Sequence, residues 1–348
     1  MFKAAVLVKQ NKPLQIMNLK VPNLDYGQVL VRMITSGICG RQIQEIFGHK
    51  GKDNFLPHLL GHEGSAIVEF AGPGVSKVKK GDKVILHWRK SQGIESTFPK
   101  YINENGLTIG GGLVTTFNEM SVVSENRLTK IPLNFDDNVA SLLGCALSTS
   151  LGIVNNEAKI KIGESVLIIG SGSTGLSLCL SAKLVSGCPV VVADISRKKL
   201  QLAKKNSDAQ ILINKNDNME NIKKNILNIF GKKGPEKVIE TSGSVKMISL
   251  CYDVLAPNGT LVLVGQPKHN DHLILKNFSK NYQGKKILDS QGGGFLPEFD
   301  IPRFVRLYES GLISTQNIIS NFTSLKKINS SIDKIKKNKI LGKCIINF

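Results

Sequence analysis

The chain has 348 residues, of which 41% are hydrophobic and 21% charged; this balance excludes wholesale disorder and favours about two globular domains. Its net charge of +19, from 46 basic and 27 acidic residues, is spread along the sequence without a basic arm, so we expect no nucleic-acid partner. No apolar run approaches the roughly 20 residues that span a bilayer. Lys9 interrupts the first apolar stretch, so we expect a cytoplasmic protein without a membrane anchor.

The first 149 residues contain short β-type runs separated by glycine-rich turns. We expect strands at residues 4–8, 28–35, 65–70 and 82–86. Turn sequences such as Gly72-Pro73-Gly74 lie between them. This pattern predicts a mainly β, barrel-like domain.

Three residues of this part have side chains that bind zinc well. Cys39 lies in a GICG sequence, His62 in GHEG and Cys145 in GCALSTS. Two thiolates and one imidazole suit zinc, and three protein ligands leave one tetrahedral position open, as in catalytic sites. Because the three lie far apart in the sequence, only the fold can assemble them. Each cysteine taken alone is more typical of a buried core position.

From about residue 160, short apolar runs alternate with helical patterns. We expect strands at 164–169, 190–193, 210–213, 237–240 and 260–265, and a helix over 197–205 with Ser196 as its N-cap. Such alternation predicts a doubly wound parallel sheet. The alternation stops near residue 290, and we expect the tail to return to the first domain.

The sequence GSGSTG at 170–175 directly follows the apolar run VLII and opens a helical pattern. In a dinucleotide-binding turn, Gly170 would allow the tight bend, Gly172 the approach of a pyrophosphate, and Gly175 the packing of helix on strand. The helix N-terminus would then present free N–H groups to the phosphates. We therefore expect a cofactor site that also includes Ser173 and Thr174.

Asp194 follows the next expected strand and predicts which dinucleotide binds. A carboxylate at this place accepts hydrogen bonds from ribose hydroxyls and repels a 2′-phosphate, which favours NAD over NADP. Arg197 and Lys199 lie just beyond it and are expected near the cofactor, where a cation would tolerate the phosphate.

Together GICG, GHEG, GDKV, GCALSTS and GSGSTG with Asp194 resemble the zinc-dependent medium-chain alcohol dehydrogenases, in the same order and over essentially the whole chain. The resemblance implies an α/β fold: a GroES-like, mainly β catalytic domain over 1–149 and 291–348, and a doubly wound Rossmann domain over 150–290, with the active site in the cleft between them. It also implies hydride transfer between an alcohol or carbonyl substrate and NAD, with zinc as Lewis acid, in a homodimer or homotetramer.

The resemblance assigns the ligands of a catalytic zinc to three residues: Cys39, His62 and Cys145. Glu63 matches an acidic residue that can approach the metal. Thr149 matches a residue beside the nicotinamide, and Lys343 stands where the family often has an arginine near the cofactor phosphates. Trp88 matches an aromatic residue of the substrate pocket.

Three departures from the family pattern change these expectations. The segment 88–117 lacks the four cysteines of the family's structural zinc, so we predict one zinc rather than two. Arg41 replaces the Ser or Thr that begins the family's proton relay, and a guanidinium cannot accept a proton. Gln44 replaces the relay histidine. Candidates for a substitute relay are Glu45, His49 and His87.

Arg41 also bears on the substrate. Its planar fork suits a carboxylate or phosphate, so we expect a substrate with a negative charge or many hydroxyls, such as a polyol or sugar derivative. The alternatives for Arg41 are an ion pair with Glu45 or a contact with the cofactor phosphates.

Two rival functions fit parts of the sequence. A zinc-free medium-chain reductase acting on quinones or enones would share the fold, but it would not need Cys39, His62 and Cys145 together. A dehydrogenase-like binding protein that has lost activity would explain Arg41 and Gln44, but not the intact dinucleotide sequence.

Overall fold

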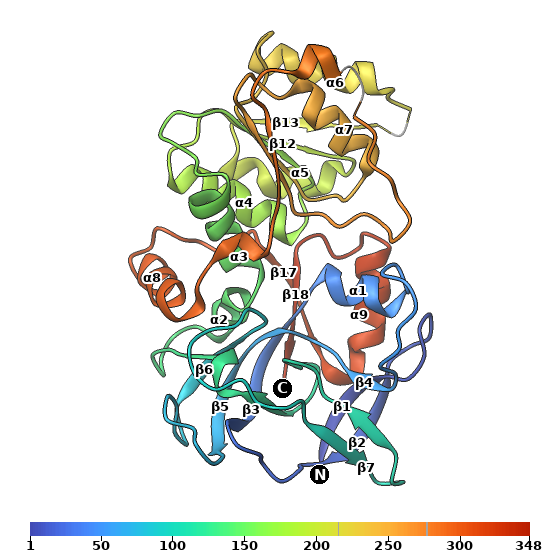
Figure 1. Ribbon diagram of the computed structural model, residues 1–348, viewed down its shortest axis with the longest axis vertical. Coiled ribbons are helices and arrows are strands. Elements are labelled where there is room, and N and C mark those ends of the chain that lie inside the picture. Colours follow the sequence, from blue (N-terminus) through green and yellow to red (C-terminus); the bar gives the residue numbers. More distant parts are fainter. Residues whose placement is uncertain (215, 276–277) are drawn as a thin grey trace. The chain divides into compact units, whose positions relative to one another are not determined.

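The computed structural model describes residues 1–214, 216–275 and 278–348 (Figure 1). Contacts within the chain divide it into two compact units. Unit 1 consists of Met1–Ser148, Leu296–Thr315 and Ile319–Phe348, and unit 2 of Thr149–Phe295 and Gln316–Ile318. That the expected segments 1–149, 150–290 and 291–348 fold as domains stays a prediction.

Unit 1 contains a small closed β-barrel. Its strands, in spatial order, are β1 (Phe2–Leu7), β2 (Gln15–Lys20), β7 (Lys100–Asn103), β8 (Thr108–Gly110) and β4 (His58–Leu59). Apolar side chains of β1 fill the barrel together with Tyr101, whose hydroxyl accepts a hydrogen bond from the backbone N–H of Val122. Closure leaves no free sheet edge in the barrel.

A second sheet of unit 1 surrounds the long strand β3 (Gln28–Ile38). The sheet order is β10 (Leu128–Lys130), β6 (Lys83–His87), β5 (Glu63–Ala71), β3, β18 (Lys343–Asn347) and β17 (Ile319–Ser324), and β9 (Met120–Ser124) also pairs with β3. In the antiparallel registers on either side of β3, Ser36 lies opposite Gly64 and Ile38 opposite Cys344. The start of β5 and the start of β18 therefore lie beside the end of β3 (Figure 1).

The helices of unit 1 are α1 (Gly40–Ile46), α2 (Asp137–Leu143), α8 (Pro297–Glu309) and α9 (Ile328–Lys336). The Asp136 side chain caps α2 by accepting hydrogen bonds from the N–H groups of Asn138 and Val139. In α9, Ile328 and Ile332 are buried in the cluster formed with β1 and β18, while both of its lysines, Lys334 and Lys336, are exposed. One face of α9 therefore packs in the core of unit 1, and its basic face is exposed.

Unit 2 is built on a parallel sheet. Its strand order is β13 (Ala209–Leu212), β12 (Val190–Asp194), β11 (Val166–Ile169), β14 (Lys237–Glu240), β15 (Thr260–Leu263) and β16 (Lys286–Asp289). The order reverses direction beside β11, as in doubly wound dinucleotide-binding sheets. The helices are α4 (Ser173–Leu184), α5 (Arg197–Ala203), α6 (Met219–Phe230) and α7 (Val245–Val254), and α3 (Ala146–Gly152) crosses the boundary between the units.

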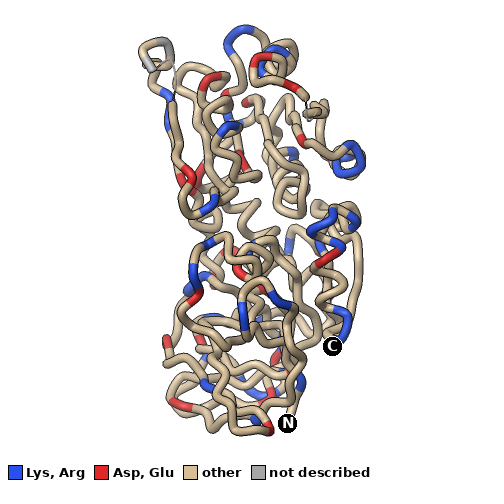
Figure 2. Tube along the Cα trace, turned by 90° about the vertical axis from the view of Figure 1, so that its right-hand side faces the viewer, with Lys and Arg blue, Asp and Glu red and all other residues tan. Residues whose placement is uncertain are grey.

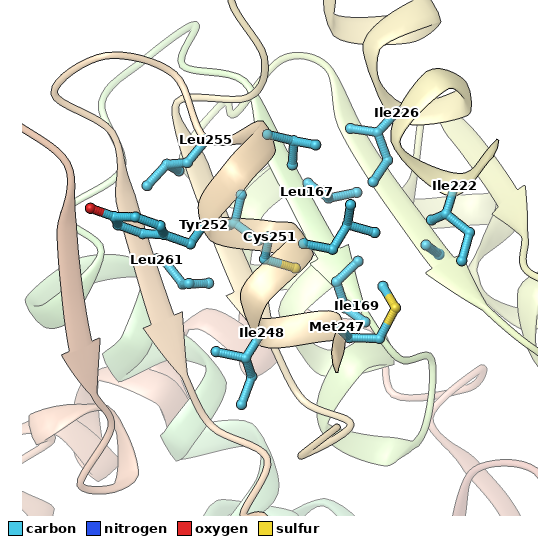
Figure 3. Close-up of a cluster of buried hydrophobic side chains, with 14 of the residues drawn as sticks. Leu167, Ile169, Ile222, Ile226, Met247, Ile248, Cys251, Tyr252, Leu255 and Leu261 are labelled. Atoms are coloured by element: carbon cyan, nitrogen blue, oxygen red, sulfur yellow. The ribbon is translucent and has the colours of Figure 1, made fainter. Parts of the chain in front are cut away.

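The central strands of unit 2 are continuous apolar runs because both of their faces are buried. All four residues of β11 are buried, as expected for a parallel strand covered on both faces. In Figure 3, Met247 and Cys251 of α7 lie beside the strand residues Leu167 and Ile169. Burial of such side chains contributes about 1.5–3 kcal/mol each.

The predicted α/β fold with a Rossmann sheet and a GroES-like β domain is confirmed. Each of the expected strands exists; the strand expected at 237–240 has the same ends as β14, and the others have at least one shifted end. Ser196 caps α5 through the N–H of Lys199. The edge strand β16 was not predicted, because its sequence KILD is short and mostly exposed and so lacks an apolar run.

Basic residues occur throughout both units rather than in one segment (Figure 2). Among the helices of the described residues, none is by itself long and apolar enough to cross a membrane. One bent pair, Asp137–Leu143 with Ala146–Glu157, meets the criteria of length and composition.

Candidate metal centre and dinucleotide turn

The three expected zinc ligands and Glu63 converge in unit 1. Cys39 lies between β3 and α1, His62 immediately precedes β5, Glu63 begins β5, and Cys145 lies between α2 and α3. One ligand atom of each lies within 4.8 Å of the others. The sheet register therefore assembles side chains that are far apart in the sequence.

Glycines make this close approach possible. Gly61, the residue before His62, has φ of +94°, which strongly favours glycine. A Cβ on Gly144, the residue before Cys145, would lie 2.3 Å from the carbonyl oxygen of Leu86 and 2.9 Å from the Cα of Glu63. A side chain at either position would move a ligand away from the cluster.

The donor set fits zinc. Nε2 of His62 is buried and has no hydrogen-bond partner among the described residues, although a buried polar atom is normally satisfied. The ligand atoms of Cys39 and Cys145 lie in the same cluster. Two sulfurs and one imidazole nitrogen are a zinc donor set that leaves one position for a substrate or water.

The thiol pKa values of the two cysteines in the cluster are shifted in opposite directions. A hydrogen bond from Cys145, assisted by the positive charge of Lys343, holds the pKa of the Cys39 thiol well below its usual value despite burial. The same hydrogen bond, together with burial, raises the pKa of Cys145. Zinc binds cysteine as the thiolate, so a metal held by both sulfurs would require Cys145 to give up its proton.

Glu63 of the cluster also forms an ion pair with Lys343, and both side chains are 0% exposed. Burial alone would lower the pKa of Lys343, but the negative charges of Glu63, Cys39 and Cys145 outweigh it and raise that pKa. Lys343 thus supplies a fixed positive charge at the centre. Its ammonium has Glu63 as a partner, and the expected role at cofactor phosphates stays a prediction.

The residues considered for a proton relay differ in their availability. Nδ1 and Nε2 of His87 contact Arg89 O and Thr129 Oγ1, and burial lowers the His87 pKa to about 3. His87 is therefore neutral and occupied on both sides. Glu45 forms an ion pair with Lys50 at 2.9 Å. His49 is exposed in the turn that follows α1, and Gln44 lies within α1.

Arg41 lies near the start of α1 and is half-buried. Burial lowers the pKa of its guanidinium, and the charges of Glu45 and Cys39 oppose this shift. The alternative of an ion pair between Arg41 and Glu45 is not found among the described residues, since Glu45 pairs with Lys50 and lies 4.0 Å from His58. Arg41 is thus a cation close to a candidate zinc ligand.

In unit 2 the three glycines of the 170–175 turn have the geometry that their spacing predicts. Gly170 has φ of +93°. A Cβ on Gly175 would lie 1.9 Å from the carbonyl oxygen of Gly170, so only glycine lets α4 pack on the turn. A Cβ on Gly172, the N-cap of α4, would meet nothing within 4 Å. The turn therefore leaves open space beside the N-terminus of α4, which Ser173 and Thr174 begin.

Asp194 ends β12 beside this turn. Its carboxylate accepts hydrogen bonds from the N–H groups of Ser171 at 2.6 Å and Ser196 at 2.8 Å. Each oxygen keeps a further lone pair for a ligand hydroxyl. Arg197 begins α5 and is exposed, and Lys199 is half-buried two residues later.

Two family models match these regions. One, described as an alcohol dehydrogenase GroES-like domain, covers residues 25–133, and the other, described as a zinc-binding dehydrogenase, covers 173–310. The chain belongs to the zinc-type medium-chain alcohol dehydrogenases. It is an enzyme of this type, an oxidoreductase of alcohols and aldehydes.

Known members of the family match almost the entire chain. Alcohol dehydrogenase 2 of Oryza sativa subsp. japonica is 25% identical, and the alignment covers 99% of this chain and 96% of the relative. An S-(hydroxymethyl)glutathione dehydrogenase of Escherichia coli is 28% identical, and the alignment covers 97% of this chain and 97% of the relative. The crystal structure of benzyl alcohol dehydrogenase from Acinetobacter calcoaceticus superposes with a TM-score of 0.88 at 24% identity, over 100% of this chain and 99% of that one.

Sequence reasoning missed one residue of the candidate metal centre, Gln42, and expected a different partner for another, Lys343. Gln42 touches His62, and the contact between Lys343 and Glu63 was not expected. Gln42 had a local signal, because it stands three residues after Cys39, at the position from which a side chain reaches back to the helix N-cap. Thr149 is buried in α3, and its role beside a nicotinamide stays a prediction, as does the pocket role of Trp88.

Proposed function

We propose that this chain is a zinc- and NAD-dependent dehydrogenase that interconverts an alcohol and its aldehyde or ketone by hydride transfer. The observation that carries the proposal is the convergence of Cys39, His62 and Cys145 around a buried imidazole nitrogen without a partner. A zinc bound there supplies Lewis-acid polarisation of the substrate oxygen, and the nicotinamide exchanges the hydride.

The chain's own residues would prepare this chemistry in three ways. Cys39, His62 and Cys145 hold the metal and leave one coordination position open. Lys343 balances the negative charge that the two sulfurs and Glu63 concentrate in a buried place. The open face at Gly172 and the N-terminus of α4 bind a pyrophosphate.

We further propose one zinc per chain. The segment 88–117, where the family can hold a structural zinc, lacks cysteine. It forms strands β7 and β8 of the barrel, and the barrel core there contains Tyr101 and Ile109. Apolar packing and strand pairing therefore stabilise this segment.

Metal analysis combined with an NAD titration separates this function from its rivals. The proposed enzyme holds about one zinc per chain and binds NAD. A quinone or enone reductase of the zinc-free type would bind the dinucleotide without zinc. A binding protein that has lost activity would oxidise none of a broad panel of alcohols and polyols. A homodimeric or homotetrameric assembly and a cytoplasmic location also belong to the proposal.

Preference for NAD is expected to depend on Asp194. Replacing Asp194 by glycine removes the carboxylate that repels a 2′-phosphate, and exposed Arg197 then attracts that phosphate. We expect the ratio of kcat/KM for NADP to that for NAD to rise at least about tenfold, equivalent to about 1.4 kcal/mol. Asp271→Gly, in an exposed loop of the same unit, is the control and leaves the ratio unchanged. Wild-type protein that already prefers NADP would contradict the assignment.

Arg41 supports a substrate that carries a negative charge or many hydroxyls, such as a sugar derivative. Its guanidinium is close to Cys39 and has no carboxylate partner among the described residues. A guanidinium binds carboxylate or phosphate through two parallel hydrogen bonds, and a charge-assisted bond contributes about 1.5–3 kcal/mol.

Substitution of Arg41 by serine tests this substrate class. We expect kcat/KM to fall about ten- to a hundredfold for an anionic alcohol and to change little for a neutral alcohol of similar size. The matched control is Arg306→Ser, an exposed arginine on α8. Equal losses on both alcohols, together with weaker NAD binding, would place Arg41 at the cofactor instead.

A further inference from the structure

One buried amide connects two of the expected zinc ligands. Gln42 is the third residue of α1, and the residue is only 3% exposed. Its amide oxygen accepts a hydrogen bond from the backbone N–H of Cys39 at 3.3 Å. Its amide nitrogen contacts Nδ1 of His62. The amide therefore lies between the cysteine and the histidine of the metal centre.

This contact determines which nitrogen of His62 carries the hydrogen. An amide nitrogen only donates hydrogen bonds, so the Nδ1 that faces it must accept. In a neutral imidazole the hydrogen is then on Nε2. Nε2 is the buried nitrogen without a partner, and while it carries a hydrogen it has no lone pair for a metal.

Binding of zinc through Nε2 requires the opposite arrangement. The hydrogen must move to Nδ1, and Nδ1 must face an acceptor, usually a carboxylate or a carbonyl. If the amide of Gln42 turns over, its oxygen meets His62, but its NH₂ group then faces the N–H of Cys39. A single amide has one oxygen for these two donors, whereas a carboxylate has two oxygens.

We propose that Gln42 is a positioning residue that holds His62 in the Nε2–H tautomer when zinc is absent and has to turn over its amide when zinc binds. The inference rests on the proposed zinc site. It implies that this chain binds zinc more weakly than it would with a carboxylate at position 42. Gln42 thereby sets the metal affinity of the centre without contacting the metal.

The zinc affinity of the variant Gln42→Glu, measured by competition with a chelator, tests whether a carboxylate at position 42 tightens zinc binding. The two oxygens of glutamate can accept from the Cys39 N–H and from Nδ1–H of His62 together. Because changes in such outer contacts alter metal affinity about 10–100-fold, we expect at least tenfold tighter binding. Gln44→Glu places the same charge on the same helix and is the control, with a change below about threefold. Binding by Gln42→Glu that is no tighter than that of Gln44→Glu would overturn the proposal.

Nitrogen-15 NMR of the histidine rings in zinc-free protein tests the tautomer directly. At alkaline pH, His62 of the wild type should carry its hydrogen on Nε2, and His62 of Gln42→Glu on Nδ1. The spectrum of His62→Asn identifies the resonances. Nδ1–H in the zinc-free wild type would contradict the inference. If no variant binds zinc, the proposed function fails, while the wild-type tautomer still decides the role of Gln42.

Discussion

Replacing Cys145 by alanine is expected to remove the bound zinc and to lower kcat/KM for alcohol oxidation at least about a thousandfold. Of the cluster, Cys39 and His62 would remain together with Glu63, whose carboxylate is already paired with Lys343. Polarisation of the substrate oxygen by a metal supplies several kcal/mol of transition-state stabilisation, and each 1.36 kcal/mol is a factor of ten in rate. Zinc per chain by elemental analysis and initial rates of NADH formation measure the two effects.

The control for this variant is Cys251→Ala. Cys251 is fully buried in α7 and packs in the core of unit 2. Its loss should reduce stability slightly and leave both zinc content and activity near the wild-type values. Retention of stoichiometric zinc and activity by Cys145→Ala would exclude Cys145 as a ligand.

Replacing Lys343 by methionine is expected to destabilise unit 1 by about 3–5 kcal/mol. The substitution keeps the volume of the side chain but leaves the Glu63 carboxylate buried without its ammonium partner. Removing one member of a buried pair leaves an uncompensated charge, which is far more costly than the pair itself. The measurement is urea unfolding followed by the fluorescence of Trp88, the single tryptophan of the chain, which lies in unit 1.

A double variant separates loss of charge balance from loss of packing. Glu63→Gln with Lys343→Met removes both charges and should recover most of the stability that Lys343→Met loses. A free energy of unfolding for Lys343→Met within about 1 kcal/mol of the wild type would show that Glu63 does not depend on Lys343. Unfolding is measured on metal-free protein, so that zinc binding does not contribute.

The sequence predicted best those elements that depend on interactions between residues close together in the chain. The run VLII followed by GSGSTG predicted strand β11, the turn and helix α4, because a buried parallel strand and a glycine turn leave direct marks in neighbouring residues. The positive φ at Gly170 and the close contact at Gly175 are the constraints that this spacing implies.

The side chains around the metal centre were less predictable because the sheet register brings them together. Lys343 meets Glu63 across 280 positions of sequence, and the pairing depends on β18 and β5 both flanking β3. No periodicity in either strand indicates that partner. The convergence of Cys39, His62 and Cys145 was likewise expected from family resemblance and not from spacing.

The most direct test of the zinc site is the rate of NADH formation by one preparation in three states: as purified, after removal of metal by a chelator, and after return of one equivalent of zinc. The rates are measured with NAD over a panel of neutral alcohols, polyols and anionic hydroxy compounds. We predict that at least one member of the panel is oxidised, that chelation abolishes the reaction, and that one zinc per chain restores it. Oxidation at an unchanged rate after complete removal of zinc would contradict the account.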